Sequence, residues 1–229
     1  MLSRVICAVL ATGLVVLACE RASAEADRSH SGDILAVRLI GGFSGVGKSA
    51  VNDAGTIIEK NSDDQVAVAA VALGYDWSKK GLPFRSEIEY GYRIRFDYDV
   101  RVFGGTDSDF ESNVSTHTLA AHIYYDIETG TRFTPFVGVG VGWAHNVADT
   151  EQTRLIGGAK ESHETATDNF TWSLHAGLHW RLGRDWRFEM AYRYTDLGEI
   201  NAGPFSDGAT VTIDSYTSHD VVFGILYAF

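Results

Sequence analysis

The sequence predicts an all-β protein, an eight-stranded antiparallel up-and-down transmembrane β-barrel. Three observations lead to this prediction. Apolar and polar residues alternate with a period of two along repeated stretches that are long for strands of a water-soluble protein. The connections between these stretches are alternately short and long, as in membrane-spanning barrels. The chain ends on an apolar aromatic strand at Phe229, which would be a sticky edge in water but is paired in a closed barrel.

Residues 1–24 have the pattern of a removable signal peptide. A positively charged start precedes a short apolar core over residues 5–18, and a small-x-small cleavage site ends at Ala24. The apolar core is too short to be a membrane-spanning helix. We therefore expect residues 25–229 to form the barrel domain. The alternative for the leader is a lipoprotein signal in which Cys19 is the lipidated residue.

Cysteine content and charge exclude several classes of function. Both cysteines lie in the leader, so the mature chain offers neither a disulfide nor thiol chemistry. The whole chain carries a net charge of −11 and the leader +1, so the mature chain carries −12. Nucleic acid is not expected as a partner, because binding to phosphates needs a basic surface. No later apolar run is long enough for a helical span, and no motif indicates a cofactor.

The clearest strand covers residues 84–98, where apolar side chains and charged side chains occupy opposite faces. The same alternation, in two cases weaker, defines seven further strands: 34–44, 65–77, 117–125, 137–143, 170–182, 186–195 and 216–229. Short connections are expected at 78–83, 127–132 and 183–185, and long loops at 46–64, 99–113, 147–168 and 196–215. An even number of strands places both termini at the periplasmic end, with the short turns.

The apolar face is predicted to contact lipid, because the opposite face is charged, small or glycine. The five lysines lie in connections, where no lipid contact is required of them. The five tryptophans fall on the apolar parity near strand ends, and we predict that they form an aromatic girdle: Trp77, Trp143, Trp172, Trp180 and Trp186.

Charges of both signs lie on the inward parity of the strands. An eight-stranded barrel is just wide enough for side chains to fill, and buried charges must pair. We therefore predict a salt-bridge network that plugs the lumen, with a narrow ion path as the alternative. The predicted network consists of Arg85, Glu87, Glu89, Arg93, Arg95, Asp97, Arg187, Glu189, Arg193 and Asp220. Gly138, Gly140 and Gly142 on a neighbouring strand are expected to leave room for the lumenal arginines.

Metal binding is not predicted from the histidines. His175 and His179 share the inward face, but four strand residues separate them by about 13 Å, too far for one ion. His122, on another strand, could approach either of them, which the sequence does not reveal. We interpret all three as lumenal hydrogen-bonding side chains.

No catalytic residues are predicted either. The run Ser218-His219-Asp220 resembles a catalytic triad, but neighbouring strand residues point to opposite faces. Ser173 and His175 have the spacing of a catalytic pair in lipid-modifying barrels, yet they lie on the inward parity instead of the lipid face. An outer-membrane lipid-modifying enzyme and a small channel remain the alternatives to a non-enzymatic protein.

The four long loops together account for the entire −12 of the mature chain. An acidic rim would not attract polyanions such as heparan sulfate. It could bind basic host or envelope proteins, or bridge divalent cations to lipopolysaccharide. Solvated loops without a fixed partner are the alternative, since aromatic anchors are few: Phe103, Phe110 and Phe205.

Four stretches carry a family resemblance: residues 120–126, residues 134–142, residues 189–198 and the terminal aromatic strand. They resemble the opacity-protein and outer-membrane-protein-A-like eight-stranded barrels of Gram-negative bacteria, over nearly all of the mature chain. The resemblance implies a monomer in the outer membrane, in contact with outer-membrane lipid and lipopolysaccharide. It also implies a structural or surface-interaction role, because members are envelope proteins, adhesins or immune-interaction proteins. The acidic loops depart from the heparan-binding opacity adhesins.

In that family the terminal aromatic strand is the signal read by the barrel-assembly machinery. Carried onto this chain, the signal consists of Phe223, Ile225, Tyr227 and Phe229. The resemblance therefore implies the assembly machinery as a partner.

Overall fold

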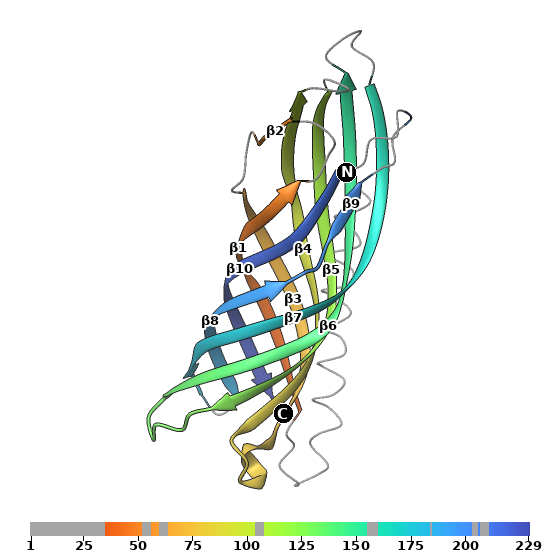
Figure 1. Cartoon of the computed structure of the whole chain (residues 1–229). Helices are drawn as coiled ribbons and strands as arrows, with labels where there is room; N and C mark the ends of the chain where they lie inside the picture. Colours follow the sequence, from red (N-terminus) through yellow and green to blue (C-terminus); the bar gives the residue numbers. More distant parts are fainter. Residues whose placement is uncertain are drawn as a thin grey trace, which may run out of the picture.

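The computed structural model describes residues 35–51, 56–59, 64–103, 108–154, 160–183, 185–202, 206 and 211–229. Eight antiparallel strands form a closed barrel, so the predicted fold class is confirmed (Figure 1). The barrel strands are β1 (Leu35–Val51), β3 (Asp64–Asp76), β4 (Phe84–Phe103), β5 (Ser108–Asp126), β6 (Phe133–Arg154), β7 (Lys160–Arg181), β8 (Trp186–Asp196) and β10 (Val211–Ala228). Two short strands, β2 (Thr56–Glu59) and β9 (Ile200–Ala202), add to the sheet.

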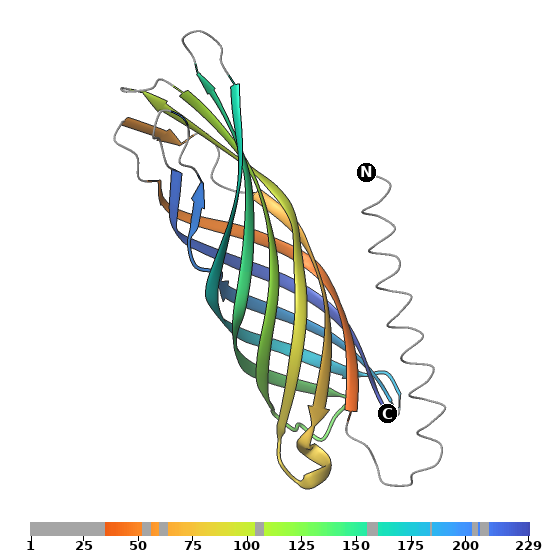
Figure 2. The same ribbon diagram turned by 90° about the vertical axis from the view of Figure 1, so that its right-hand side faces the viewer.

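The barrel closes between its first and last strands. Strands follow the order β1-β3-β4-β5-β6-β7-β8-β10, and β10 pairs with β1 from Ala228 opposite Ala36 to Ile213 opposite Val51. The backbone N–H of Phe229 donates to the carbonyl of Leu35 over 3.0 Å. Figure 2 shows the C-terminus at the end of the barrel that carries the short turns. We call this end the turn end and the opposite end the loop end.

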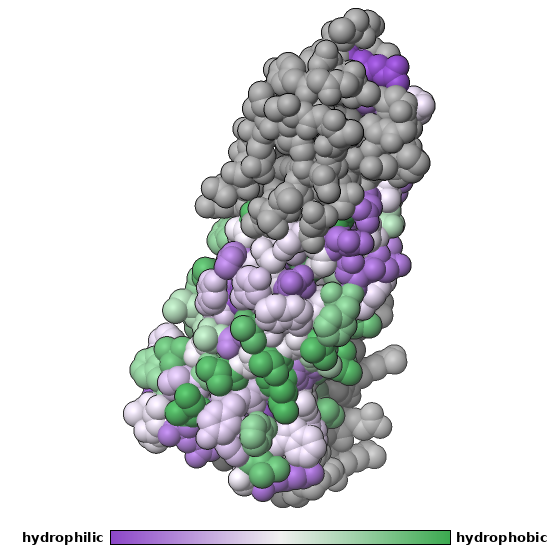
Figure 3. Space-filling view, in the orientation of Figure 1, coloured by the Kyte–Doolittle hydropathy of each residue, from purple (hydrophilic) through white to green (hydrophobic). Residues whose placement is uncertain are grey.

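The two faces of the wall differ as the alternation predicts. On β4, Arg85 is 2% exposed and Ile88 is 62% exposed. The two positions are an odd number of residues apart, so their side chains lie on opposite faces of the strand. Large apolar side chains cover the outside of the lower barrel in the view of Figure 3, and polar side chains lie above them. Charges lie inside and apolar residues outside, the inverse of a water-soluble barrel. Within the described residues, no helix is long and apolar enough to cross a membrane.

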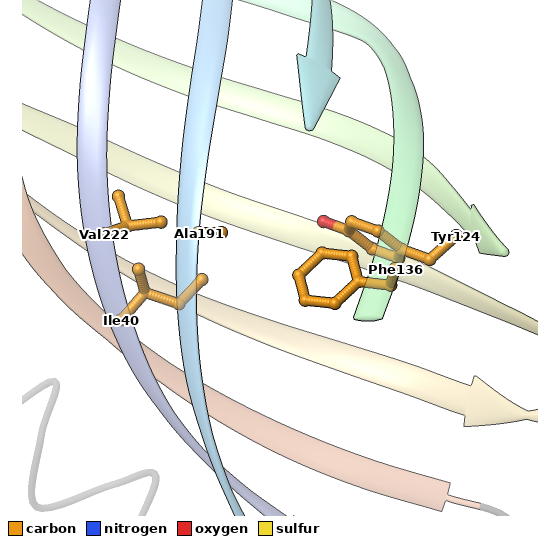
Figure 4. Packing of buried hydrophobic residues seen from close by; sticks show 5 residues of the cluster. All are labelled: Ile40, Tyr124, Phe136, Ala191 and Val222. Atoms are coloured by element: carbon orange, nitrogen blue, oxygen red, sulfur yellow. The ribbon is translucent and has the colours of Figure 1, made fainter. Parts of the chain in front are cut away.

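A small apolar cluster lies among the polar side chains of the lumen. Figure 4 shows Tyr124 and Phe136 on one side of it and three aliphatic residues on the other. The aliphatic residues come from β1, β8 and β10, and are Ile40, Ala191 and Val222. The rings of Tyr124 and Phe136 meet edge to face, with centroids 5.6 Å apart. The cluster adds apolar packing inside the charged lumen.

The first short connection is a 3₁₀ turn, η1 (Trp77–Lys80). Strand β3 ends at Asp76, whose carboxylate accepts a hydrogen bond from the Ser78 N–H over 3.0 Å. Gly81 ends the turn at φ 76°, a left-handed conformation that favours glycine. The expectation that the strand includes Trp77 is therefore wrong by one residue, because Asp76 caps the turn.

The predicted loops at residues 99–113 and 147–168 are wrong over most of their length. Strands β4 and β5 pair up to Val102 opposite Ser108, and β6 and β7 pair up to Thr153 opposite Lys160. Beyond the apolar band the outer face also carries polar and charged side chains, so the apolar alternation stops while the backbone ladder continues. A register shift between Arg93 and Phe96 marks this passage on β4.

The remaining predicted loops also contain strand. Residues of the predicted loop 46–64 extend β1 to Val51 and form β2, which pairs with β4. Residues of the predicted loop 196–215 form β9, which pairs with β10, and the start of β10 itself. The long strands β4 to β7 rise past the rest of the barrel (Figure 2). We call this part, formed by residues 94–103, 108–116, 145–154 and 160–170, the extension.

Candidate functional site in the barrel lumen

Arg38 of β1 is the centre of the charge network in the lumen. Its guanidinium forms ion pairs with three glutamates, Glu189 at 2.5 Å, Glu87 at 2.7 Å and Glu89 at 3.0 Å. It also donates a hydrogen bond to the Tyr124 hydroxyl over 3.0 Å. The Arg38 side chain is only 3% exposed, so this charge depends on its partners instead of water.

The network continues toward the turn end through Arg85. Its Nε atom donates to Asp126 over 2.8 Å, and its Nη1 atom donates to Glu87 over 3.0 Å. The guanidinium carbon lies 4.7 Å from the ring centre of Tyr124 and 5.2 Å from that of Phe136. Cation–π contacts therefore join the apolar cluster to the charges.

Toward the loop end, two further arginines share one carboxylate. Arg193 pairs with Glu89 at 2.5 Å and with Asp220 at 2.9 Å. Arg93 pairs with the same Asp220 oxygen at 2.8 Å and donates to Ser218 over 3.1 Å. The chain of ion pairs thus runs without a break from Asp126 to Arg93, across β1, β4, β5, β8 and β10.

Seven of the ten residues expected in the network lie in it with buried side chains: Arg85, Glu87, Glu89, Arg93, Glu189, Arg193 and Asp220. Arg187 lies apart from them, because it pairs with Asp76 at 2.8 Å near the turn end. Arg95 and Asp97 belong to β4, but their side chains fall outside the described part.

Three members of the site were missed by the sequence analysis. Arg38 lies in a weakly patterned strand, yet it is the one charged residue of Leu35–Val46, and inward parity could have identified it. Asp126 ends β5 and lies between the expected strand 117–125 and the expected turn 127–132, so it was given no face. Tyr124 was counted on the inward face without a role, although an inward tyrosine in a charged lumen signals a hydrogen bond.

The lumenal histidines lie in two places. The rings of His122 and His175 meet edge to face at 4.8 Å, and the Ser173 hydroxyl lies 2.8 Å from Nε2 of His175. His179 instead packs on Phe136 at 4.6 Å. His122 therefore approaches His175 and not His179. Within the described residues, no three acidic, histidine or cysteine side chains are placed to hold a metal ion.

The three consecutive residues Ser218, His219 and Asp220 point to different sides of the wall. Ser218 and Asp220 are fully buried in the lumen, and His219 is exposed on the outer face. His219 contacts Tyr192 of β8 instead of its two chain neighbours.

The expectation that the glycines of β6 make room for arginines was wrong: Gly138 and Gly140 face aromatic rings, and Gly142 lies against Leu119 and Ala120 of β5. A Cβ atom at Gly138 would lie 2.3 Å from the Tyr124 ring. One at Gly140 would lie 2.2 Å from the His122 ring and 2.6 Å from the Ser173 hydroxyl. Bulky inward residues on β5 therefore require bare backbone opposite them on β6.

Four of the five tryptophans of the expected girdle are exposed on the outer face, as are Phe223 and Ile225 of the expected assembly signal. Trp180 and Trp186 are at the turn end, whereas Trp143 and Trp172 lie toward the loop end. Trp77 lies in η1, where its ring donates to Ser86 over 3.0 Å. In the terminal strand, Tyr227 packs on Trp186 at 4.8 Å and on Phe229 at 5.9 Å, and Phe223 packs on Phe188 at 6.3 Å; Ile225 lies between them.

A polar vestibule of about 250 Å³ opens at the turn end, below the charge network. Its lining includes Asp76, Asp126, Glu128, His179, Arg181 and Arg187. Beside the network itself, the cavity between Glu89, Arg93 and His122 measures only about 20 Å³. That is the size of one water molecule, whereas the vestibule could hold several.

An outward apolar band and a charged lumen define an integral outer-membrane barrel protein. The model of the outer membrane protein beta-barrel domain matches residues 11–229, and the chain belongs to this family. The predicted family and outer-membrane localisation in a Gram-negative bacterium are therefore confirmed. The signal peptide lies outside the described residues and stays a prediction.

Three relatives illustrate the similarity. Outer membrane protein PagN of Salmonella typhimurium is 29% identical over 171 residues, 69% of this chain and 71% of that protein. The crystal structure of Neisserial surface protein A matches with a TM-score of 0.54 and 13% identity, over 85% of this chain and 97% of the other. Outer membrane protein OprG from Pseudomonas aeruginosa matches with a TM-score of 0.50 and 17% identity, over 86% and 98%. The two structures, at these identities, bear on the fold alone.

Proposed function

We propose that this outer-membrane barrel is a non-enzymatic surface-interaction protein, adhesin-like, whose extension binds basic partners. The observation that carries this proposal is the outer face of the extension. Five carboxylates lie on it within the described side chains, against the single cation Lys160. We call this set the acidic face: Glu111, Asp149, Glu151, Glu164 and Asp168.

The acidic face includes like charges placed directly opposite each other on paired strands. Glu111 lies opposite Glu151, and Asp149 lies opposite Glu164. Such pairs destabilise a sheet. Lys160 offsets part of the charge: it donates a hydrogen bond to Glu151, which raises the pKa of Lys160. Repeated repulsion on one exposed face supports a role for that face in attracting positive charge.

The extension supports the proposal by its reach. Strand β6 continues eleven residues beyond Trp143, to Arg154. At about 3.3 Å per residue this is roughly 35 Å of strand, although tilt reduces the height gained. A paired sheet holds its carboxylates in fixed positions, which a flexible loop would not do. A positively charged partner would therefore meet a preformed surface.

The charge network supports a plugged lumen beneath this surface. Five carboxylates and four arginines fill the section between Asp126 and Arg93. A steady ion path would require these ion pairs to separate. Separation would leave charged side chains buried without a partner, which is energetically unfavourable. We therefore propose that the barrel anchors the extension and does not conduct.

The surface role is tested with a matched pair of variants. Intact barrel in vesicles is titrated with polylysine, and binding is followed by tryptophan fluorescence. Replacing the five carboxylates of the acidic face by Gln or Asn should weaken binding about tenfold and reduce its salt dependence. The control neutralises Glu128 and Asp185, two carboxylates of the turn end. Equal binding by wild type and the acidic-face variant would contradict the proposal.

The plug is tested separately in planar bilayers. Wild-type barrel should show no steady conductance. Stable openings of the wild type that Arg93→Ala abolishes would contradict the plug, because they would require a path lined by that arginine. Mass spectrometry of lipid A from cells with and without the protein tests the non-enzymatic part, and changed acyl chains would overturn it.

A further inference from the structure

Two histidine clusters of the same design lie on the outer face of the barrel. In the first, the Nδ1 atom of His117 on β5 is hydrogen-bonded to the hydroxyl of Tyr90 on β4 over 2.8 Å. In the second, the Nδ1 atom of His219 on β10 is hydrogen-bonded to the hydroxyl of Tyr192 on β8 over 2.5 Å. In both clusters the tyrosine precedes the histidine by 27 residues.

The likeness extends to a second tyrosine in each cluster. Tyr92 lies directly opposite His117 with ring centres 4.7 Å apart, and Tyr194 lies directly opposite His219 with ring centres 5.2 Å apart. Each histidine is thus held by a Tyr-x-Tyr pair on the neighbouring strand. Four strand positions separate β5 from β10 in either direction around the barrel. The clusters therefore lie on opposite sides of the wall.

Both histidines end the outward apolar series of their strands. From the turn end toward the loop end, the outward residues of β5 are Tyr125, Ile123, Ala121 and Leu119, followed by His117. On β10 they are Tyr227, Ile225, Phe223 and Val221, followed by His219. The amphipathic tyrosines beside them are residues that settle at the level of lipid headgroups. Because long loops of such barrels face outward, these clusters lie at the outer leaflet.

The Nε2 nitrogen of each ring is available to a ligand at this level. With Nδ1 engaged by a tyrosine hydroxyl, Nε2 has no hydrogen-bond partner among the described residues. Nε2 donates a hydrogen bond when the tyrosine donates to Nδ1, and also when the ring is protonated. An imidazole that meets an anion is favoured in its protonated form. Between the two ends of the outward apolar band, no described strand side chain that faces outward is lysine or arginine.

We propose that His117 and His219 bind phosphate groups of outer-leaflet lipid through their Nε2 atoms. The occupant is the phosphorylated lipid A headgroup, the anionic group at this level of an outer membrane. The proposal is independent of the acidic face and its partners. None of the residues opposite the histidines on the adjacent strands is a carboxylate that would repel a phosphate. The neighbours are Tyr90, Tyr92 and His145 for His117, and Tyr192, Tyr194 and Gly45 for His219.

His145 provides a matched control at the same level. It lies directly opposite His117 on β6, and its ring stacks on Trp143. Its Nδ1 atom, however, lies 2.7 Å from the carboxylate of Asp168 instead of a tyrosine hydroxyl. A protonated His145 is therefore neutralised inside the protein, and we expect it to add little to phosphate binding.

The test uses the full-length protein in nanodiscs that contain lipid A with both phosphates or with both removed. The imidazole ¹⁵N signals of His117 and His219 should shift only with phosphorylated lipid A, and their titration should move to higher pH there. In native mass spectrometry, the double variant His117→Gln/His219→Gln should retain phosphorylated lipid A about threefold less than wild type. His145→Gln should retain it as wild type does.

Three outcomes would overturn the proposal. The first is an equal shift with dephosphorylated lipid A. The second is an equal loss of binding in His145→Gln. The third is reproduction of the shifts by millimolar inorganic phosphate in detergent, which would indicate a site for free anions. Both substituted side chains lie outside the lumen, and gel mobility before and after heating checks that the variants are folded.

Discussion

Strands β4 to β7 run from the barrel into the extension. The backbone ladder continues through both regions, but charged side chains are buried and paired in the first and exposed in the second. Within the barrel, Glu89 is 3% exposed and paired with arginines on two other strands. In the extension, Glu164 of the same sheet is exposed and faces another carboxylate. The comparison teaches that the ladder decides where strands run, whereas the solvent on each face decides which side chains they carry.

The strongest test of this difference removes the centre of the network. Arg38→Met should lower the free energy of unfolding by about 3–5 kcal/mol, because Glu189 loses its arginine in a buried place. Urea unfolding in lipid vesicles measures it. The control Arg187→Met, whose pair with Asp76 lies near the water of the vestibule, should change stability by less than about 1 kcal/mol. Similar losses in both variants would mean that burial does not distinguish the two pairs.

The second-largest loss of stability is expected from a side chain added where the lumen has no room for it. Gly140→Ala should destabilise the barrel by about 1–3 kcal/mol, since its Cβ would lie 2.2 Å from the His122 ring. Gly41→Ala on β1 is the matched control, because nothing lies within 4 Å of its added Cβ. Thermal unfolding of both variants in the same lipid gives the comparison. If Gly41→Ala costs as much, strand propensity and not lumen packing is responsible.

The chain end should affect assembly more than stability. Among the described residues, Phe229 adds one ring contact, to Tyr227, and one backbone bond, to Leu35. Deleting it should lower the membrane-inserted fraction in cells several-fold if the terminal aromatic strand is the assembly signal, with export unchanged. Replacement by Tyr, which keeps the aromatic ring, is the control. Normal insertion of the deleted chain would remove this residue from the signal.

The smallest effect is expected in the extension. Glu164→Gln should stabilise the sheet by up to about 0.5 kcal/mol at low salt, because it relieves repulsion from Asp149. The gain should disappear at high salt. Denaturant unfolding at two salt concentrations measures it, and Ala166→Gln, on the same face of β7 but opposite the uncharged Val147, controls for a change of side chain. A loss of stability in Glu164→Gln would show that the carboxylate makes a favourable contact in the sheet.

The barrel and most of its lumenal charges could be predicted from the sequence, because lipid outside and charge inside create a strong period-two pattern. The ends of β4 to β7 could not, since that pattern vanishes where Glu151 and Gln152 both lie in a polar setting. The place of Arg38 in the network was not predicted for a related reason. Its strand is rich in glycine and small residues, so a single charge was the only signal of its inward face.

The meeting of β7 and β9 has a mechanical consequence. Of the described residues in β7, those from Lys160 to Thr171 form a backbone ladder with β6 only. Toward β9 they are held by side-chain hydrogen bonds, such as that from Asn169 to the Glu199 carbonyl at 2.7 Å. A force that pulls on the extension would act on the long backbone ladders in shear, so that many hydrogen bonds carry it together. At the seam between β7 and β9, the same force would act on a few side-chain hydrogen bonds one after another. We expect the seam to yield first and so to spare the closed ring below it.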